Sequence, residues 1–191
     1  ELDNFLSVLF DNAPRNVEQL QAVILEELTV AQLKIFGSDI DEYKYFFSGQ
    51  TPRTEEECRD QLLKLMRPLP FGINAAPEGH VADDKRCDII CTLGNLMVPI
   101  EVKGQWHPAL WTAADHQLAL LYSNDWRANS RGIYLVFWFG TYPSKNLKAP
   151  PNRMAKPKSA KELKDALTKQ SATAMNGCIE VVVLDLERPH A

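Results

Sequence analysis

Residues 85–103 read KRCDIICTLGNLMVPIEVK, and the expected architecture of the chain is centred on this stretch. Two apolar runs in it are separated by Gly94-Asn95, a pair that favours a tight turn between antiparallel strands. We therefore expect a β-hairpin. Counting outward from a two-residue turn places Asp88 directly across from Glu101 on the neighbouring strand.

Two carboxylates that face each other among apolar neighbours need an explanation, because like charges directly opposite destabilise a sheet. A divalent cation is the natural one, since Mg²⁺ binds one or two protein carboxylates and keeps several waters. Strand alternation puts Lys103 on the same face as Glu101, where a lysine can orient an attacking water or stabilise the phosphorane transition state. The alternative is a solvent-facing strand edge that carries Asp88 and Glu101 as ordinary surface charges.

Hydrophobic spacing and capping residues predict the elements around the hairpin. Asn16 caps a first helix, Thr54 a second, and Ser159 a last one. The continuous apolar run of residues 132–139 is typical of a strand covered on both faces. In chain order we expect helix 17–36, helix 54–67, strands 73–81, 85–92 and 96–103, helix 108–123, strand 132–139, helix 159–174 and strand 179–186. This order predicts an α/β fold.

The helix expected over residues 108–123 carries a polar residue on its apolar stripe, which consists of Leu110, Ala114, Gln117 and Leu121. Gln117 therefore faces the core. We expect it to hydrogen bond either to water on the metal or to a backbone phosphate. The alternative is a buried glutamine that the backbone satisfies.

Composition limits the class of protein. The chain has 191 residues, of which 45% are hydrophobic and 24% charged, and a net charge of −4, so disorder and coiled coil are excluded as the main architecture. No apolar stretch approaches the length of a membrane span. Four cysteines without a CxxC pair favour a reduced, cytoplasmic protein.

Residues 1–50 carry helical patterns but no chemical motif. We expect them to form an N-terminal helical extension, the end of a preceding domain, and residues 51–191 to form the functional domain. The first residues, Glu1-Leu2-Asp3, lack a methionine, so we expect a fragment of a larger parent protein.

Positive charge is concentrated in residues 145–164, which carry a net +6. Prolines in its first part predict a long basic loop. We expect this loop to contact the phosphates of a nucleic acid. The alternative is a solvated loop that offsets an acidic body. The candidate contact residues are Lys145, Lys148, Arg153, Lys156 and Lys158.

Asp88, then Glu101-Val102-Lys103 on the next strand and Gln117 on the following helix, resembles the PD-(D/E)XK superfamily of restriction-endonuclease-like phosphodiesterases. The resemblance covers about residues 51–186. It implies an αβββαβ core with a mixed central sheet flanked by helices, and a magnesium-dependent nuclease in which Mn²⁺ also serves. Asp88 and Glu101 would hold the metal, and Lys103 would assist water activation.

Many members of this superfamily also place a glutamate on the first helix of the core. We expect Glu55 in this role, since it shares a helix face with Cys58 and Leu62. Glu57 and Glu78 are the alternatives. His80 and His107 are assigned to the surface, although either can lie near the site.

The sequence thus predicts a metal-dependent DNA endonuclease. By analogy of fold it would be the C-terminal effector of a larger bacterial antiviral defence protein. Self-association is a further prediction, because cutting both strands of a duplex usually needs two sites. The alternatives are a catalytically inactive nucleic-acid-binding or protein-interaction module on the same fold.

Overall fold

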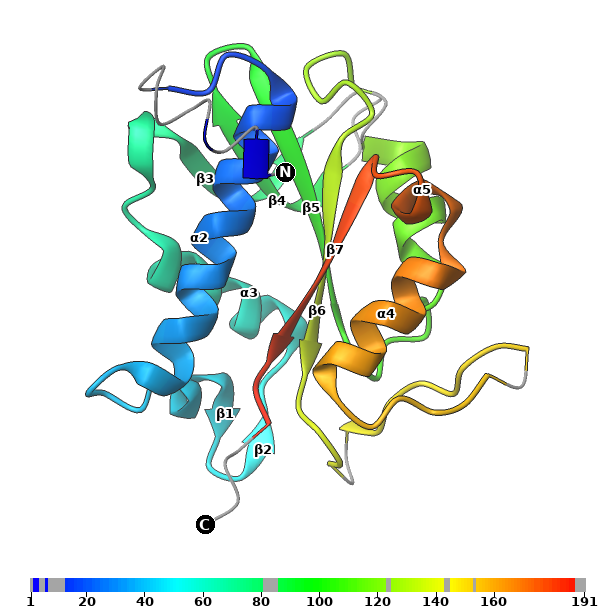
Figure 1. Cartoon of the computed structure of the whole chain (residues 1–191). Helices are drawn as coiled ribbons and strands as arrows, with labels where there is room; N and C mark the ends of the chain where they lie inside the picture. Colours follow the sequence, from blue (N-terminus) through cyan, green and yellow to red (C-terminus); the bar gives the residue numbers. More distant parts are fainter. Residues whose placement is uncertain are drawn as a thin grey trace.

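The computed structural model describes residues 2–3, 6, 13–80, 86–122, 125–142, 145–152 and 154–187. A five-stranded mixed sheet in the order β3-β4-β5-β6-β7 lies between two layers of helices (Figure 1). The strands of this sheet are β3 (Asn74–His80), β4 (Arg86–Leu93), β5 (Leu96–Gly104), β6 (Gly132–Trp138) and β7 (Ile179–Asp185). The helices are α2 (Val17–Gly37), η1 (Glu42–Phe46), α3 (Glu55–Met66), η2 (Pro70–Gly72), η4 (Ala114–Tyr122), α4 (Ala160–Gln170) and α5 (Ala172–Met175). The mixed α/β class is confirmed.

The expected hairpin is present as β4 and β5. Leu93 pairs with Leu96, and the antiparallel register runs without a slip to Ile89 and Ile100. Gly94 takes the first turn position with φ 56°, a conformation that glycine adopts without steric cost. One further step in this register places Asp88 across from Glu101.

The other half of the sheet is parallel. β5 pairs with β6, and β6 pairs with β7, all in parallel register. Because paired residues point to the same face, the register of Glu101 with Tyr134 and of Lys103 with Val136 puts all four side chains on one side of the sheet. The chain leaves β6 after Trp138, at the edge where these parallel strands end, and the described residues that follow before α4 are 139–142, 145–152 and 154–159 (Figure 1).

Capping residues begin the helices where the sequence predicts. The side chain of Asn16 accepts from the Gln19 N–H at the start of α2, and that of Ser159 accepts from Glu162 at the start of α4. Thr54 forms a capping box with Glu57, which satisfies two otherwise unpaired N–H groups at the start of α3.

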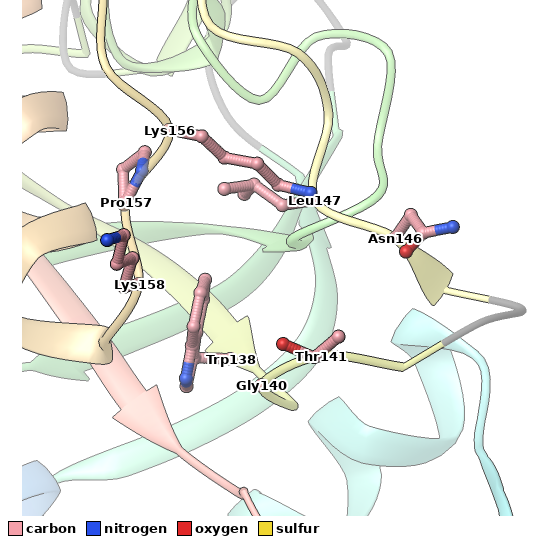
Figure 2. Close-up of a pocket in the computed structure, with 8 residues that line it drawn as sticks. All are labelled: Trp138, Gly140, Thr141, Asn146, Leu147, Lys156, Pro157 and Lys158. Atoms are coloured by element: carbon pink, nitrogen blue, oxygen red, sulfur yellow. The ribbon is translucent and has the colours of Figure 1, made fainter.

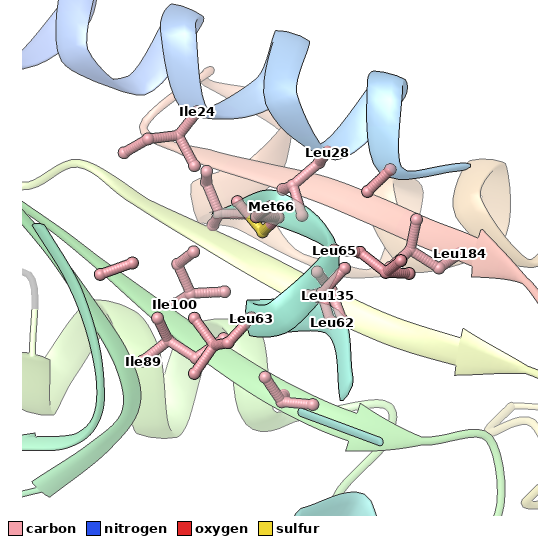
Figure 3. Packing of buried hydrophobic residues seen from close by; sticks show 14 of the residues in the cluster. Ile24, Leu28, Leu62, Leu63, Leu65, Met66, Ile89, Ile100, Leu135 and Leu184 are labelled. Atoms are coloured by element: carbon pink, nitrogen blue, oxygen red, sulfur yellow. The ribbon is translucent and has the colours of Figure 1, made fainter. Parts of the chain in front are cut away.

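Each face of the sheet packs against its own helices. α2 and α3 cover one face with side chains such as Ile24, Leu28 and Leu62, which meet Ile100 and Leu135 of the sheet (Figure 3). η4 and α4 cover the other face, which holds the second apolar cluster. The first 50 residues thus contribute to the main core, and whether residues 51–191 fold alone stays a prediction.

Three elements differ from the sequence-based expectation. The segment predicted as one helix over 108–123 forms turns followed by η4, which is wound as a π-helix. The last helix stops at Gln170, and α5 is a separate turn capped by Ser171. A two-stranded sheet, β1 (Phe47–Ser48) with β2 (Thr51–Pro52), was not predicted.

Within the described part of the chain, every helix falls short of the length and apolar character that a membrane span requires.

Candidate functional site

The side chain of Asp88 bonds to the backbone of the neighbouring strand, just beyond the last backbone pair of the hairpin. Its Oδ2 accepts a hydrogen bond of 2.7 Å from the backbone N–H of Val102. This bond begins just beyond the last backbone pair, Ile89 with Ile100. The carboxylate is therefore held by the strand that carries Glu101 and Lys103, and two-thirds of its side chain is shielded from solvent.

A single ammonium joins the two acids. Lys103 Nζ donates to Glu101 Oε1, and it lies 3.6 Å from Asp88 Oδ2. It also donates to the Val102 carbonyl at 3.0 Å. Glu101 is 2% exposed and Lys103 6%, so solvent reaches this trio mainly through Asp88.

Burial and charge shift the protonation of this trio. Burial raises the pKa of Glu101 to about 7, and the neighbouring Asp88 adds to the rise while Lys103 opposes it. The proximity of Asp88 thus favours the protonated form of Glu101. Burial would lower the pKa of Lys103, but Glu101 and Asp88 outweigh it and raise that pKa.

Glu55, on the first turn of α3, reaches the end of the same strand. Its Oε1 accepts a hydrogen bond of 2.8 Å from the N–H of Gly104, the residue after Lys103. Burial raises the pKa of Glu55, and Lys103 and Asp88 both act on it electrostatically. Glu55 therefore lies close enough to Lys103 and Asp88 to interact with them, and its catalytic role stays a prediction.

The two alternative glutamates are engaged elsewhere. Glu57 bonds to Arg53 and to the Thr54 N–H in the capping box. Glu78 lies 3.7 Å from Arg59. Neither contact touches Asp88 or Glu101.

The donor set of this cluster suits a hard cation. Among the described residues, no group of three or more His, Cys, Asp and Glu side chains is arranged to hold a metal ion. The carboxyls of Asp88 and Glu101, which share the Lys103 ammonium, nevertheless match what Mg²⁺ uses, namely one or two carboxylates with waters and substrate oxygens completing the octahedron. The residues that would hold it are Asp88 and Glu101.

No family model, no curated protein and no solved structure matches this chain. Functional conclusions about it therefore rest on its own residues.

Within the described residues, Gln117 Oε1 makes no hydrogen bond to the cluster. It is half-buried on η4, which packs on the same face of the sheet as Glu101. Its Oε1 is buried without a hydrogen-bond partner in the described part of the chain. The backbone thus does not satisfy this oxygen, and its predicted role stays a prediction.

The basic loop begins next to the cluster. Lys145 Nζ lies 4.1 Å from the centre of the Trp106 ring, a cation–π contact. Lys148 donates its backbone N–H to the Gln105 carbonyl at 2.8 Å, and its side chain is exposed. Lys156 and Lys158 are exposed further along. Arg153 lies outside the described residues.

No sequence pattern singles out Gln105, which is fully buried and follows Lys103 by two residues. Its Nε2 donates to the carbonyls of Gly140 and Lys145, both at 2.8 Å, and its Oε1 accepts from the Phe139 N–H at 2.8 Å. These bonds fasten the start of the basic loop to the end of β5. The sequence shows only a glutamine near the charged Glu-Val-Lys motif. It does not indicate the bonding partners of this glutamine, because all of them are distant along the chain.

His107 is half-buried and interacts electrostatically with two residues of the cluster. Burial lowers its pKa, Lys103 lowers it further, and Asp88 opposes this. Its Nδ1 accepts the Ala109 N–H at 3.0 Å, so the neutral ring carries its proton on Nε2. His107 is thus a neutral hydrogen-bond donor beside the acidic cluster.

Proposed function

We propose that this protein is a Mg²⁺-dependent endonuclease that hydrolyses phosphodiester bonds of DNA. The observation that carries the proposal is the convergence of Asp88, Glu101 and Lys103 on one face of the sheet, with Glu55 at the strand end. Burying acids and a lysine costs free energy, and ionisable groups with shifted pKa values cluster at functional sites.

The chain's own residues divide the work. Asp88 and Glu101 would hold the metal, and Mn²⁺ has the same ligand preference. When bound, Mg²⁺ polarises the scissile phosphate and lowers the pKa of a coordinated water. Lys103 supplies a positive charge at fixed position, and such preorganised charge stabilises the additional negative charge of the transition state. Glu55 holds the Gly104 backbone, and with it the end of the strand that carries Lys103.

Two features beyond the cluster support this assignment. The order of elements from α3 to β6, with an antiparallel hairpin followed by a parallel pair, supports the proposal, because the PD-(D/E)XK resemblance implies an αβββαβ core. The basic loop starts at the edge of the sheet where the cluster lies, because Gln105 fastens it there. A phosphate backbone that crosses the cluster would meet the lysines of this loop.

The test is cleavage of supercoiled plasmid and of circular single-stranded DNA in Mg²⁺, Mn²⁺ or EDTA. We expect cutting only with a divalent metal. Asp88→Asn and Lys103→Met should each slow it at least about a hundredfold, as removal of a preorganised group does. Asp165→Asn and Lys161→Ala, exposed changes on α4, are the matched controls and should cut normally. Equal cutting by Asp88→Asn and the unaltered chain would exclude this site.

A binding module without catalysis is the second candidate. The observation that favours it is that Lys103 already compensates both carboxyls, and Glu55 already accepts from Gly104. In that case DNA binding would persist in every variant, and no metal would produce cutting. The wider role as effector of a defence protein stays a prediction.

A further inference from the structure

A cavity of about 340 Å³ opens beside the carboxyl end of β6 (Figure 2). Trp138 stands between the segment with Pro157 and Lys158 and the segment with Gly140 and Thr141. Lys156 extends across the cavity towards Leu147. The remaining lining residue is Asn146. The volume falls at the lower end of the range for sites that take small molecules, about 300–1,000 Å³.

The cavity lies on the same face and at the same edge of the sheet as the acidic cluster. Lys103 pairs with Val136, and Trp138 is the next residue of β6 on that face. Strand spacing and rise then place Trp138 roughly 8 Å from Lys103, measured between Cα atoms. Gln105 bonds to Gly140, a lining residue, so the wall of the cavity is fastened to the strand that carries Lys103.

The lining combines two chemistries. Trp138, Leu147 and Pro157 are buried and present apolar surface. Lys156 and Lys158 are exposed at the rim, and both charged side chains of the lining are positive. Thr141 and Asn146 add polar groups that can donate and accept hydrogen bonds.

This lining suits a ligand that has a flat apolar group with hydrogen-bonding edges and a phosphate attached to it. We propose that the cavity binds one unpaired nucleotide of the substrate strand, with the base against Trp138 and Leu147 and its phosphate at Lys156 and Lys158. The proposal rests on the proposed function and sharpens it, because it assigns the substrate as a strand with at least one unstacked base.

A base inside a duplex does not fit this description. Its hydrogen-bonding edge is occupied by its partner, and both of its faces are stacked on neighbouring base pairs. Single strands expose the face and edge of each base, and contacts to an aromatic side chain contribute about 1–3 kcal/mol per base. The enzyme should therefore prefer single-stranded or locally unpaired DNA over a closed duplex.

The experiment compares two ligands with equal phosphate charge in EDTA, so that no cutting occurs. One is a five-nucleotide oligothymidylate, and the other is the abasic five-unit deoxyribose phosphate. We expect the abasic strand to bind at least about tenfold more weakly to the unaltered chain. A free mononucleotide, compared with inorganic phosphate, tests whether the cavity also takes the ligand outside a strand.

Two variants assign the effect to the cavity. Thr141→Phe, at an exposed lining position, fills it and should abolish the preference for bases while binding to the abasic strand persists. Lys156→Ala with Lys158→Ala should weaken the binding of both strands. The matched control is Lys161→Ala with Lys169→Ala on α4, where both lysines are exposed and outside the lining.

Equal binding of the two strands by the unaltered chain would overturn the proposal. So would a base preference that Thr141→Phe leaves intact. Because no metal is present, these results are separate from the nuclease assay. Cutting without a base preference refutes the cavity alone, and a base preference without cutting refutes the nuclease alone.

Discussion

Lys103 is a buried charged residue that is paired with two acids, and it therefore differs from an ordinary surface lysine. Its ammonium is nearly inaccessible to solvent, and it contacts Glu101 and Asp88. Each of these groups would be expensive to bury alone. Loss of one member therefore leaves the others uncompensated.

The raised pKa of Glu101 predicts a loss of stability as the pH rises. Glu101 titrates near 7 in the folded protein against 4.5 when unfolded, so the folded state binds the extra proton between these values. The free energy of unfolding should fall by about 2.5 kcal/mol between pH 5 and 8, relative to Glu101→Gln. Urea unfolding of both proteins in EDTA measures this, and a difference that is constant with pH would contradict it.

Gln105 should be a major determinant of stability. Gln105→Ala would leave the Phe139 N–H and the carbonyls of Gly140 and Lys145 without this partner in a buried setting. We expect a loss of about 2–4 kcal/mol in the free energy of unfolding. Gln170→Ala, at the end of α4, should change it by less than about 0.5 kcal/mol. Equal effects of the two changes would show that the Gln105 bonds contribute nothing.

The capping residue Thr54 should affect both the stability of the protein and the candidate site, because α3 begins there and carries Glu55 on its first turn. Thr54→Ala removes the capping box next to Glu55, and Ser159→Ala removes the corresponding cap of α4. Each should cost about 1 kcal/mol in the free energy of unfolding. Only Thr54→Ala should also slow DNA cutting, because Glu55 then loses its fixed position against Gly104. Equal slowing by both variants would argue against a positioning role for Glu55.

Local signals explain what the sequence predicts well. Caps at Asn16, Thr54 and Ser159 and the turn at Gly94 act within a few residues, so the pattern alone is sufficient to locate them. The hairpin register then places Asp88 by Glu101 without further information.

Long-range contacts explain what the sequence does not show. The partners of Gln105 are 34 to 40 residues away. η4 is wound as a π-helix and packs against β5 and β6, whereas hydrophobic periodicity predicts an ordinary α-helix there. β1 and β2 are two residues each, too short for alternation to be visible.

The helix α2 should be needed for folding. Leu20, Ile24, Leu28 and Ile35 of α2 are at most 1% exposed, and they pack in the same core as α3 and the sheet (Figure 3). Each such burial contributes about 1.5–3 kcal/mol, which together rivals the stability of a typical domain. A chain that starts at Thr51 should therefore lose cooperative thermal unfolding and bind a hydrophobic dye. A sharp transition in that shorter chain would instead support an independent domain of residues 51–191.

Asp88 and Glu101 together are proposed to form a divalent-metal site, and Mn²⁺ binding followed by electron paramagnetic resonance tests this proposal without requiring activity. We expect one Mn²⁺ per chain, displaced by excess Mg²⁺. Binding should be weakened at least about tenfold in Glu101→Gln and retained in Asp165→Asn, which lies on exposed α4. Mn²⁺ binding that Glu101→Gln leaves unchanged, or its absence from the unaltered chain at millimolar metal, would contradict the proposal.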